Sequence, residues 1–373
     1  MTEYIAATEN RVDDCATISI LSKVPSSATN VYEINPLSDP RWKVFVTGHP
    51  KASAFHTASW LRALHTAYGY EPVVITTSSP DTALTNGLAF CRIKSWLTGR
   101  RLVSLPFSDH AEPLADNSEQ IDNLLFEMKR RVDVGQWKYV EIRPTSFLPG
   151  EQTGLQKSVG YSLHRLDLRP SAAQLFRHFH KSCVQRKIRR AEREKLQYEE
   201  GRSENLLKKF HTLLLATRRR QCLPPQPLFW FRALINTFGE NLKIRVASKN
   251  GLPIASILTL SHKKSIVYKY GCSDARFHRL GGMAVLFWNT IQQGKDEGFE
   301  ELEMGRSENT NPGLISFKEH WGAVGRSLNY WAYPYSPHMI PGTWDKIILR
   351  YVVPACPDVV LSTAGELLYR HIG

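Results

Sequence analysis

Apolar and polar positions follow the same order of periods at two places along the chain. In the second half they alternate through three segments, recur at helical spacing in a fourth and alternate again in a fifth. Asn250-Gly251 is a tight-turn signal between the first two segments. The pattern therefore predicts three antiparallel strands, a helix and a strand, over residues 242–248, 252–260, 265–271, 281–297 and 299–304.

The first half predicts the same five elements, over residues 72–77, 84–93, 101–106, 118–134 and 137–142. The two closing strands, GQWKYVEIRP and GFEELEMGRS, share a glycine, alternating apolar positions, a glutamate and an arginine. Five elements in one order favour a duplicated domain over chance similarity.

A segment of a different pattern separates the two copies. Helices are predicted over residues 171–180, 182–196, 203–220 and 227–238. Ser203 is the expected N-cap of the third helix, and Pro224-Pro225 interrupts the run before the fourth.

Length and composition agree with two folded domains of the α+β class. The 373 residues are 42% hydrophobic and 22% charged, which excludes a disordered chain. We expect a mainly antiparallel, mixed sheet flanked by helices in each domain. The predicted division is residues 1–165, residues 166–343 with the basic helical segment 171–240, and C-terminal amphipathic helices over 344–373. Residues 1–50 predict only strand and loop.

The positive charge is concentrated in one segment. The formal net charge is +13, and residues 176–220 hold 14 Lys and Arg against five Glu, which is +9. Such an excess indicates a phosphate-bearing partner. The alternative is a solvated helix face whose glutamates pair with the basic residues at helical spacing.

Several classes of protein are not expected. Residues 1–24 lack the apolar run of a signal peptide, and no stretch is long and apolar enough to span a membrane. No CxxC pair and no HExxH motif occurs, and His178 and His180 are too few for a metal site, so we expect reduced thiols, no metal and a cytoplasmic location. The tail, residues 344–351 and 358–372, is amphipathic, which favours core packing over docking on a membrane surface.

The loop before the second-copy helix is a candidate phosphate site. It carries the spacing Arg279-x-x-Gly282-x-Ala284, with Gly281 beside Gly282. Small residues let a phosphate approach the backbone N–H groups at the start of a helix, where the helix dipole stabilises negative charge. An ordinary glycine-rich helix start would have the same sequence. The first copy has the acidic segment 109–118 here, so we expect a phosphorylated donor to bind only the second copy.

A second cluster follows the closing strand of the second copy. Gly305-Arg306 leaves the strand, and a short helix then presents Phe317, Lys318 and Trp321. The alternative interpretation is a helix packed by its aromatic residues, with a solvated lysine.

These segments resemble a known family. GRSENTNPGLISFKEHWGA, ARFHRLGGMAVLFWNTI and CVQRKIRRAEREKLQYEEG are similar to the tandem-GNAT proteins of the Fem type, which include peptidoglycan aminoacyltransferases and acyltransferases associated with exopolysaccharide synthesis. The C-terminal RYVVPACPDVVLSTAGELLYRHIG resembles the exopolysaccharide-associated branch. The resemblance covers roughly residues 50–373.

The resemblance implies two tandem GNAT-like domains and acyl transfer to an amine or hydroxyl. Phe317-Lys318 matches the family's Phe-Lys motif at the reaction cleft, and the family's first-domain acid matches Asp109, with Glu112 and Asp116 nearby. We expect Arg279, Gly281, Gly282 and Ala284 to hold the donor phosphates, and Phe317, Arg186, Arg189 and Arg190 to contact substrate. Lys318 and Arg306 are the candidates for stabilising negative charge, and Asp109 and Glu303 are the candidate proton acceptors, although Glu303 fits a structural ion pair equally well.

Three functions remain open at this point. The first is an acyltransferase that uses acyl-CoA as co-substrate, with no permanent cofactor, on a phosphorylated, nucleotide-linked or lipid-linked sugar of a cell-envelope or exopolysaccharide precursor. The second is an aminoacyltransferase that uses aminoacyl-tRNA on a peptidoglycan precursor. The third is a non-enzymatic nucleic-acid-binding protein, which would leave the second-copy loop and the Phe-Lys helix unused. A peripheral contact with the inner face of the membrane is compatible with the first two.

Overall fold

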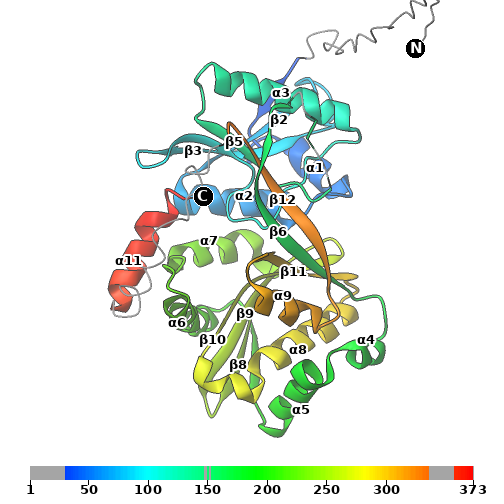
Figure 1. The fold of residues 1–373 in the computed structure, drawn as a ribbon, viewed down its shortest axis with the longest axis vertical. Coiled ribbons are helices and arrows are strands. Elements are labelled where there is room, and N and C mark those ends of the chain that lie inside the picture. The colour runs from blue at the N-terminus through cyan, green and yellow to red at the C-terminus, as the bar shows by residue number, and fades with distance from the viewer. Residues whose placement is uncertain (1–29, 147–148, 151–152, 336–356, 373) are drawn as a thin grey trace, which may run out of the picture. The chain divides into compact units, whose positions relative to one another are not determined.

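A single sheet of twelve strands runs through both halves of the chain (Figure 1). The computed structural model describes residues 30–146, 149–150, 153–335 and 357–372. The strands lie in the order β1-β2-β3-β4-β5-β12-β6-β11-β10-β9-β8-β7.

Both predicted copies are present, with the same connectivity. The first consists of β2 (Glu71–Thr76), β3 (Leu88–Ser95), β4 (Gly99–Val103), α3 (Ser118–Asp133) and β5 (Tyr139–Ile142). The second consists of β8 (Leu242–Lys249), β9 (Leu252–His262), β10 (Ser265–Ser273), α8 (Gly282–Asp296) and β11 (Glu301–Glu308). In each copy the first three strands are antiparallel, and the helix returns the chain to a strand parallel to the third. The duplication and the α+β fold class are confirmed.

The two copies exchange strands at the middle of the sheet. β6 (Gln156–Asp167), which follows the first copy, pairs with β11 of the second copy. β12 (Val324–Tyr333), which follows the second copy, pairs with β5 of the first. β6 and β12 also pair with each other and lie side by side (Figure 1). The predicted boundary between residues 165 and 166 falls inside β6, so the domain limits stay a prediction.

The segment between the copies contains the expected helices and one strand, β7, that was not predicted. It holds α4 (Ala172–His178), a π turn η3 (Lys181–Gln185), α5 (Arg186–Arg193), β7 (Gln197–Gly201), α6 (Glu204–Arg220) and α7 (Leu228–Phe238). The Ser203 side chain accepts a hydrogen bond from the Leu206 amide, which confirms Ser203 as the N-cap of α6. The expectation of strand and loop over residues 1–50 is wrong beyond β1 (Tyr32–Ile34), because α1 (Pro40–Gly48) buries Trp42 and Val46; residues 1–29 lie outside the description.

Helices cover the sheet through three main apolar clusters. α3 packs on one face of the first copy. α4, α5 and α8 pack on the second copy in the corresponding way. A shared core joins α1 and α2 (Ala58–Tyr68) to α6, α7 and the strands β8 to β10. The halves therefore share a core as well as a sheet.

The C-terminal helix is held against this shared core. α11 (Asp358–Tyr369) buries Leu361, Gly365 and Tyr369, and the Tyr70 hydroxyl donates to the Tyr369 carbonyl at 2.8 Å. The expected core packing is confirmed for α11; the other predicted tail segment, 344–351, lies outside the described residues. None of the helices in the described ranges combines the length and the apolar character needed to cross a membrane.

Candidate active site

Strands β10 and β11 part in the middle of the second copy. Their parallel pairing covers only Ser265–Val267 against Glu301–Glu303, although both strands continue. Beyond this point β11 is irregular against β6, and Gly305 adopts φ 71°, a left-handed conformation that favours glycine. The separation makes room between two central strands for side chains from elsewhere.

The first copy places an acid in this opening. Asp109 follows β4 and is 8% exposed. Lys269 Nζ on β10 lies 3.2 Å from both of its carboxylate oxygens, and Arg306 Nε on β11 lies 4.0 Å from Oδ1. An added Cβ at Gly305 would lie 3.2 Å from Asp109 Oδ2, so glycine there permits the close approach. Burial lowers the pKa of Lys269, and the negative charge of Asp109 opposes that shift.

Lys318 closes the same opening from α9 (Pro312–Glu319). Its side chain is 1% exposed, and Nζ donates to the carbonyls of Gly305 at 2.6 Å and Arg306 at 3.0 Å. Burial lowers the pKa of Lys318 to about 8, while the charges of Asp109 and Glu303 oppose the shift. The alternative of a solvated lysine is therefore wrong. Asp109, Lys269, Arg306 and Lys318 are called the Asp109 cluster below.

Aromatic residues hold Arg306 in place. Its guanidinium lies 4.5 Å from the ring centroid of Tyr161 and 5.2 Å from that of Tyr330, and it donates to the Tyr330 hydroxyl. Tyr330 in turn donates to the carbonyl of Asp109 at 2.8 Å. Both tyrosines lie on the exchanged strands β6 and β12, so the strand exchange positions the arginine.

Glu303 lies beside the cluster in an ion pair of its own. His110 Nε2 approaches it at 2.9 Å and Arg165 donates to it at 3.1 Å. Burial alone would raise the pKa of Glu303, but His110 and Arg165 outweigh burial and lower it to about 2. A carboxylate with so low a pKa is a weak proton acceptor, so the geometry favours the structural ion pair over the catalytic alternative.

A cleft of about 1110 Å³ opens next to Glu303. Residues of both halves line it, including Ser53, His110 and Ser146 from the first and Lys263 and Glu301 from the second. Arg165 on β6 lines it as well. The cleft is of a size that takes a small-molecule substrate.

Phe317 and the other two acids of the Asp109 loop have structural contacts. Phe317 packs edge-on against Phe287, with ring centroids 5.6 Å apart. Glu112 is buried and accepts four hydrogen bonds from the backbone and hydroxyl groups of Thr145 and Ser146, and Asp116 is exposed. Of the three acids, Asp109 is therefore the one in the cluster.

The glycines before α8 are tightly packed. A Cβ added at Gly281 would lie 2.2 Å from the carbonyl oxygen of Lys187. A Cβ added at Gly282 would lie 3.0 Å from Ala255 Cβ. Gly281 also has φ 84°, so close packing against α5 and backbone conformation are sufficient reasons for this sequence. Ala284 is buried in the second-copy core, whereas Arg279 is exposed. The residue at the N-cap of α8, Gly281, has no side chain to cap the first turn.

The predicted substrate-contact residues of α5 lie beside this loop rather than in the cleft. Arg186, Arg189 and Arg190 are exposed and are not among the residues that line the cleft. Arg189 lies over the ring of Phe176, and Arg190 pairs with Glu194. Their role in binding substrate stays a prediction.

Sequence reasoning missed Lys269, His110 and Tyr330. The signal for Lys269 was present, because a lysine interrupts the apolar strand SIVYKYGC. Tyr330 gave no local signal, since its contacts depend on where β12 inserts.

Comparison with known proteins agrees with this architecture. Residues 179–318 match the family model described as an acetyltransferase (GNAT) domain. This chain has the tandem-GNAT fold of the Fem type. The crystal structure of FemX aligns with a TM-score of 0.63 at 12% identity, covering 82% of this chain and 98% of that one. The C-terminal domain of a putative lysylphosphatidylglycerol synthetase from Agrobacterium fabrum gives 0.51 at 15%, covering 79% and 90%. A tandem GNAT protein from the clavulanic acid biosynthesis pathway gives 0.50 at 9%, covering 81% and 98%.

No curated protein matches the chain in sequence. The GNAT match ends at Lys318 and includes β8 to β11 and α8, so the chain is an acyltransferase-type enzyme with its GNAT domain in the second half. The non-enzymatic alternative is set aside on this ground.

Proposed function

We propose that the chain transfers an acyl group from acyl-CoA to an amine or hydroxyl of a cell-envelope or exopolysaccharide precursor. The contrast between the two corresponding helix starts carries the proposal. In the first copy, Asn117 caps α3 by accepting from the Gln120 amide, which occupies one of the free N–H groups. In the second copy, α8 has no side-chain cap and follows the exposed Arg279. A side chain therefore competes with an anion at the first start but not at the second.

The surroundings of this helix start are positive. The pKa of His278 is lowered first by burial and then by the positive charges of Arg220 on α6 and Lys187 on α5, and the negative charge of Asp274 opposes this shift. We assign the donor's phosphates to this surface, with Arg279 and the N–H groups of Gly282 and Ala284 as their contacts. No step of this binding requires a permanent cofactor.

The Asp109 cluster supplies the groups that acyl transfer requires. The acceptor's nitrogen or oxygen attacks the thioester carbon and gives up a proton, and the carbonyl oxygen becomes negative. The bond to sulfur then breaks, and CoA leaves as a thiolate that takes up the released proton. We assign the proton to Asp109 and stabilisation of the negative charge to Lys318 and Arg306. Phe317 would hold Lys318 in place by packing α9 on the core. Transfer is then direct, without an acyl-enzyme intermediate.

The cleft, whose lining includes His110 and Glu303 beside the Asp109 cluster but none of the four cluster residues, is the proposed acceptor site. Its mixture of basic and hydroxyl side chains, such as Arg165, Lys263 and Ser146, fits a phosphorylated, nucleotide-linked or lipid-linked sugar. A lipid-linked acceptor would bring the enzyme to the inner face of the membrane.

The exposed basic face of α5 favours aminoacyl-tRNA as a second candidate donor. Arg186, Lys187 and Arg193 are exposed on one short helix. Such a face would bind a polyanion with an affinity that falls steeply as salt rises. In that case the acceptor would be a peptidoglycan precursor.

A thermal-shift panel with CoA, acyl-CoAs, UDP-sugars and charged tRNA tests the donor. We expect CoA to raise the melting temperature of the wild type and of the control variant Lys208→Glu, which reverses an exposed charge on α6. The shift should be lost in Arg279→Glu and in Gly282→Glu. No response to CoA together with salt-sensitive binding of tRNA would overturn the CoA proposal in favour of tRNA.

A further inference from the structure

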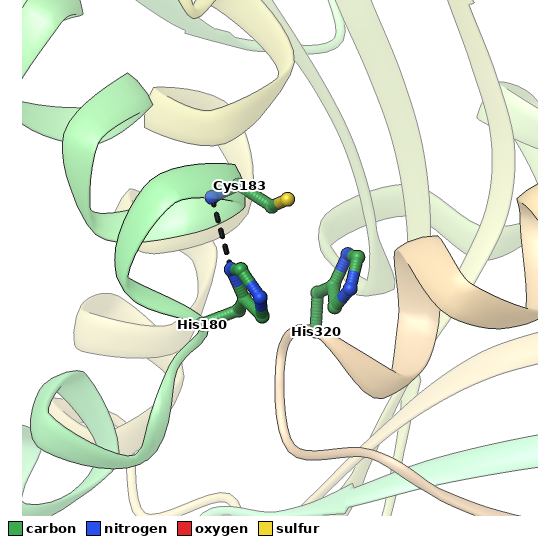
Figure 2. Close-up of side chains that lie close together, drawn as sticks. All are labelled: His180, Cys183 and His320. Atoms are coloured by element: carbon green, nitrogen blue, oxygen red, sulfur yellow. Dashed lines mark hydrogen bonds between the residues drawn. The ribbon is translucent and has the colours of Figure 1, made fainter.

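Two histidines and a cysteine gather on the second half, away from the Asp109 cluster. His180 precedes η3, Cys183 lies within it, and His320 follows α9. One ligand atom of each lies within 4.8 Å of the others. Figure 2 shows the thiol and the two imidazole rings around one space between η3 and the end of α9.

The backbone holds the two histidines together. The His180 amide donates to the His320 carbonyl at 2.9 Å, and the ring centroids are 4.3 Å apart. The Cys183 amide donates to His180 Nδ1 at 3.2 Å, which fixes the thiol beside the same ring. The three side chains are therefore brought together before any ligand binds.

Most ligand atoms in this group have no competing partner. Neither ring nitrogen of His320 makes a hydrogen bond with the described residues. Cys183 is a free thiol, and the Ser182 hydroxyl lies 3.9 Å from its sulfur. A ligand that takes His180 Nδ1 would replace two exposed hydrogen bonds, those with the Cys183 amide and the Ser182 hydroxyl, each worth about 1 kcal/mol. Structural zinc sites gain about 10 kcal/mol or more, so this cost does not prevent binding.

We propose that His180, Cys183 and His320 bind a zinc-type divalent transition metal. Two imidazole nitrogens and one thiolate are the ligand set that Zn²⁺ prefers, and three protein ligands leave a fourth position for water. The set contains no carboxylate, so Mg²⁺ and Ca²⁺ are poor candidates. Bond lengths of about 2.0 to 2.3 Å require the ligand atoms to close by about an ångström, and partly exposed side chains can do this.

The ion would link two distant parts of the chain. It would fasten η3, at the start of the basic helix α5, to the end of α9, just after Lys318. The sequence predicted no metal site because His180 and Cys183 lie far along the chain from His320, and only the fold joins them. The proposal does not depend on the proposed acyl transfer.

The test is titration of the tag-free, metal-stripped full chain with Zn²⁺ against a chromophoric chelator. We expect one ion per chain and no binding of Mg²⁺. His180→Gln, Cys183→Ser and His320→Gln should each lower the affinity at least about tenfold, since loss of a supporting contact alone typically costs about 10- to 100-fold. His178→Gln and Cys222→Ser serve as controls and should bind as the wild type does.

Two further readouts report on the site itself. Bound Co²⁺ should give a thiolate-to-metal charge-transfer band that Cys183→Ser abolishes, and Zn²⁺ should slow alkylation of Cys183 but not of Cys222. Wild-type affinity in any one of the three ligand variants, or no binding to the wild type, would overturn the proposal. Circular dichroism of each variant distinguishes loss of a ligand from loss of the fold.

Discussion

The two copies use the same loop, between the third strand and the helix, for opposite purposes. In the first copy the loop after β4 turns into the protein, buries Asp109, His110 and Glu112, and leads to a capped helix. In the second copy the loop after β10 stays at the surface, carries the exposed Arg279 and leads to an uncapped helix. The first loop places one acid, Asp109, against the second copy, and the second loop exposes positive charge to solvent.

This difference explains why both copies are needed for one site. Lys269, Arg306 and Lys318 belong to the second copy, and Asp109 from the first copy supplies a carboxylate that offsets part of their positive charge. A buried charge is costly without its partner, so the Asp109 cluster is stable only when both copies are in place. In the proposed function the copies therefore divide the work, because the first supplies the proton acceptor and the second binds the donor.

The largest expected effect comes from removing the cluster's deepest cation. Lys318→Met should lower turnover about 100-fold, comparable to loss of one donor that stabilises negative charge in a transition state. It should also cost about 1 to 3 kcal/mol of stability, because two carbonyls lose their donor. Steady-state kinetics and urea denaturation measure the two effects.

Lys295→Met is the matched control for this variant. Lys295 Nζ also donates to two carbonyls, those of Leu168 and Pro170, but it lies outside the cluster. It should lose similar stability and keep full turnover. Equal turnover in the two variants would show that Lys318 is only structural.

Acid unfolding tests the Glu303 ion pair. The folded-state pKa of about 2 lies below the ordinary 4.5, so the ionised carboxylate contributes stability above pH 4.5 that is lost as the pH falls towards 2. The difference corresponds to about 3 kcal/mol. Glu303→Gln should therefore be less stable than the wild type at neutral pH, and the gap should shrink on acidification.

Glu301→Gln is the control on the same strand. Glu301 is about a third exposed and lies 3.7 Å from Arg165, so its loss should change the acid profile little. Identical profiles for the wild type and Glu303→Gln would contradict the assigned ion pair.

A smaller effect is expected where the copies touch. Gly305→Ala introduces a methyl group 3.2 Å from Asp109 Oδ2 at a left-handed residue, which should cost about 1 to 2 kcal/mol and lower turnover about tenfold by displacing the carboxylate. Gly251→Ala shares the left-handed conformation, with φ 77°, but an added Cβ would meet nothing within 4 Å. It should lose stability alone, as thermal unfolding and kinetics of the two variants will show.

Local patterns predicted the repeated elements but not the strands that join the two copies into one sheet. The three strands, helix and strand of each copy follow from alternation and helical spacing within one continuous stretch of chain. β6 and β12 did not, because their pairing is decided by strands far away in sequence. α1 was not predicted from the pattern, although it begins at Pro40 and proline fits the first turn of a helix.

The candidate site was predicted in part for the same reason. Motif resemblance pointed to Asp109, Arg306 and Lys318, which the fold brings together. Their partner Lys269 was missed because a single lysine in a strand has no meaning until its neighbours are known. The ion pair of Glu303 could not be predicted because its partners are distant in sequence. His110 lies in the loop after β4, and Arg165 lies on β6.

The division of labour between the copies is tested most directly by Asp109→Asn. We expect this variant to lose turnover without losing affinity for the donor, which is measured by titration with CoA. We expect CoA affinity to stay within about twofold of the wild type while kcat falls at least about 100-fold, the usual contribution of a positioned proton acceptor. Wild-type turnover, or a loss of CoA affinity as large as the loss of turnover, would contradict the proposed division of labour between the copies.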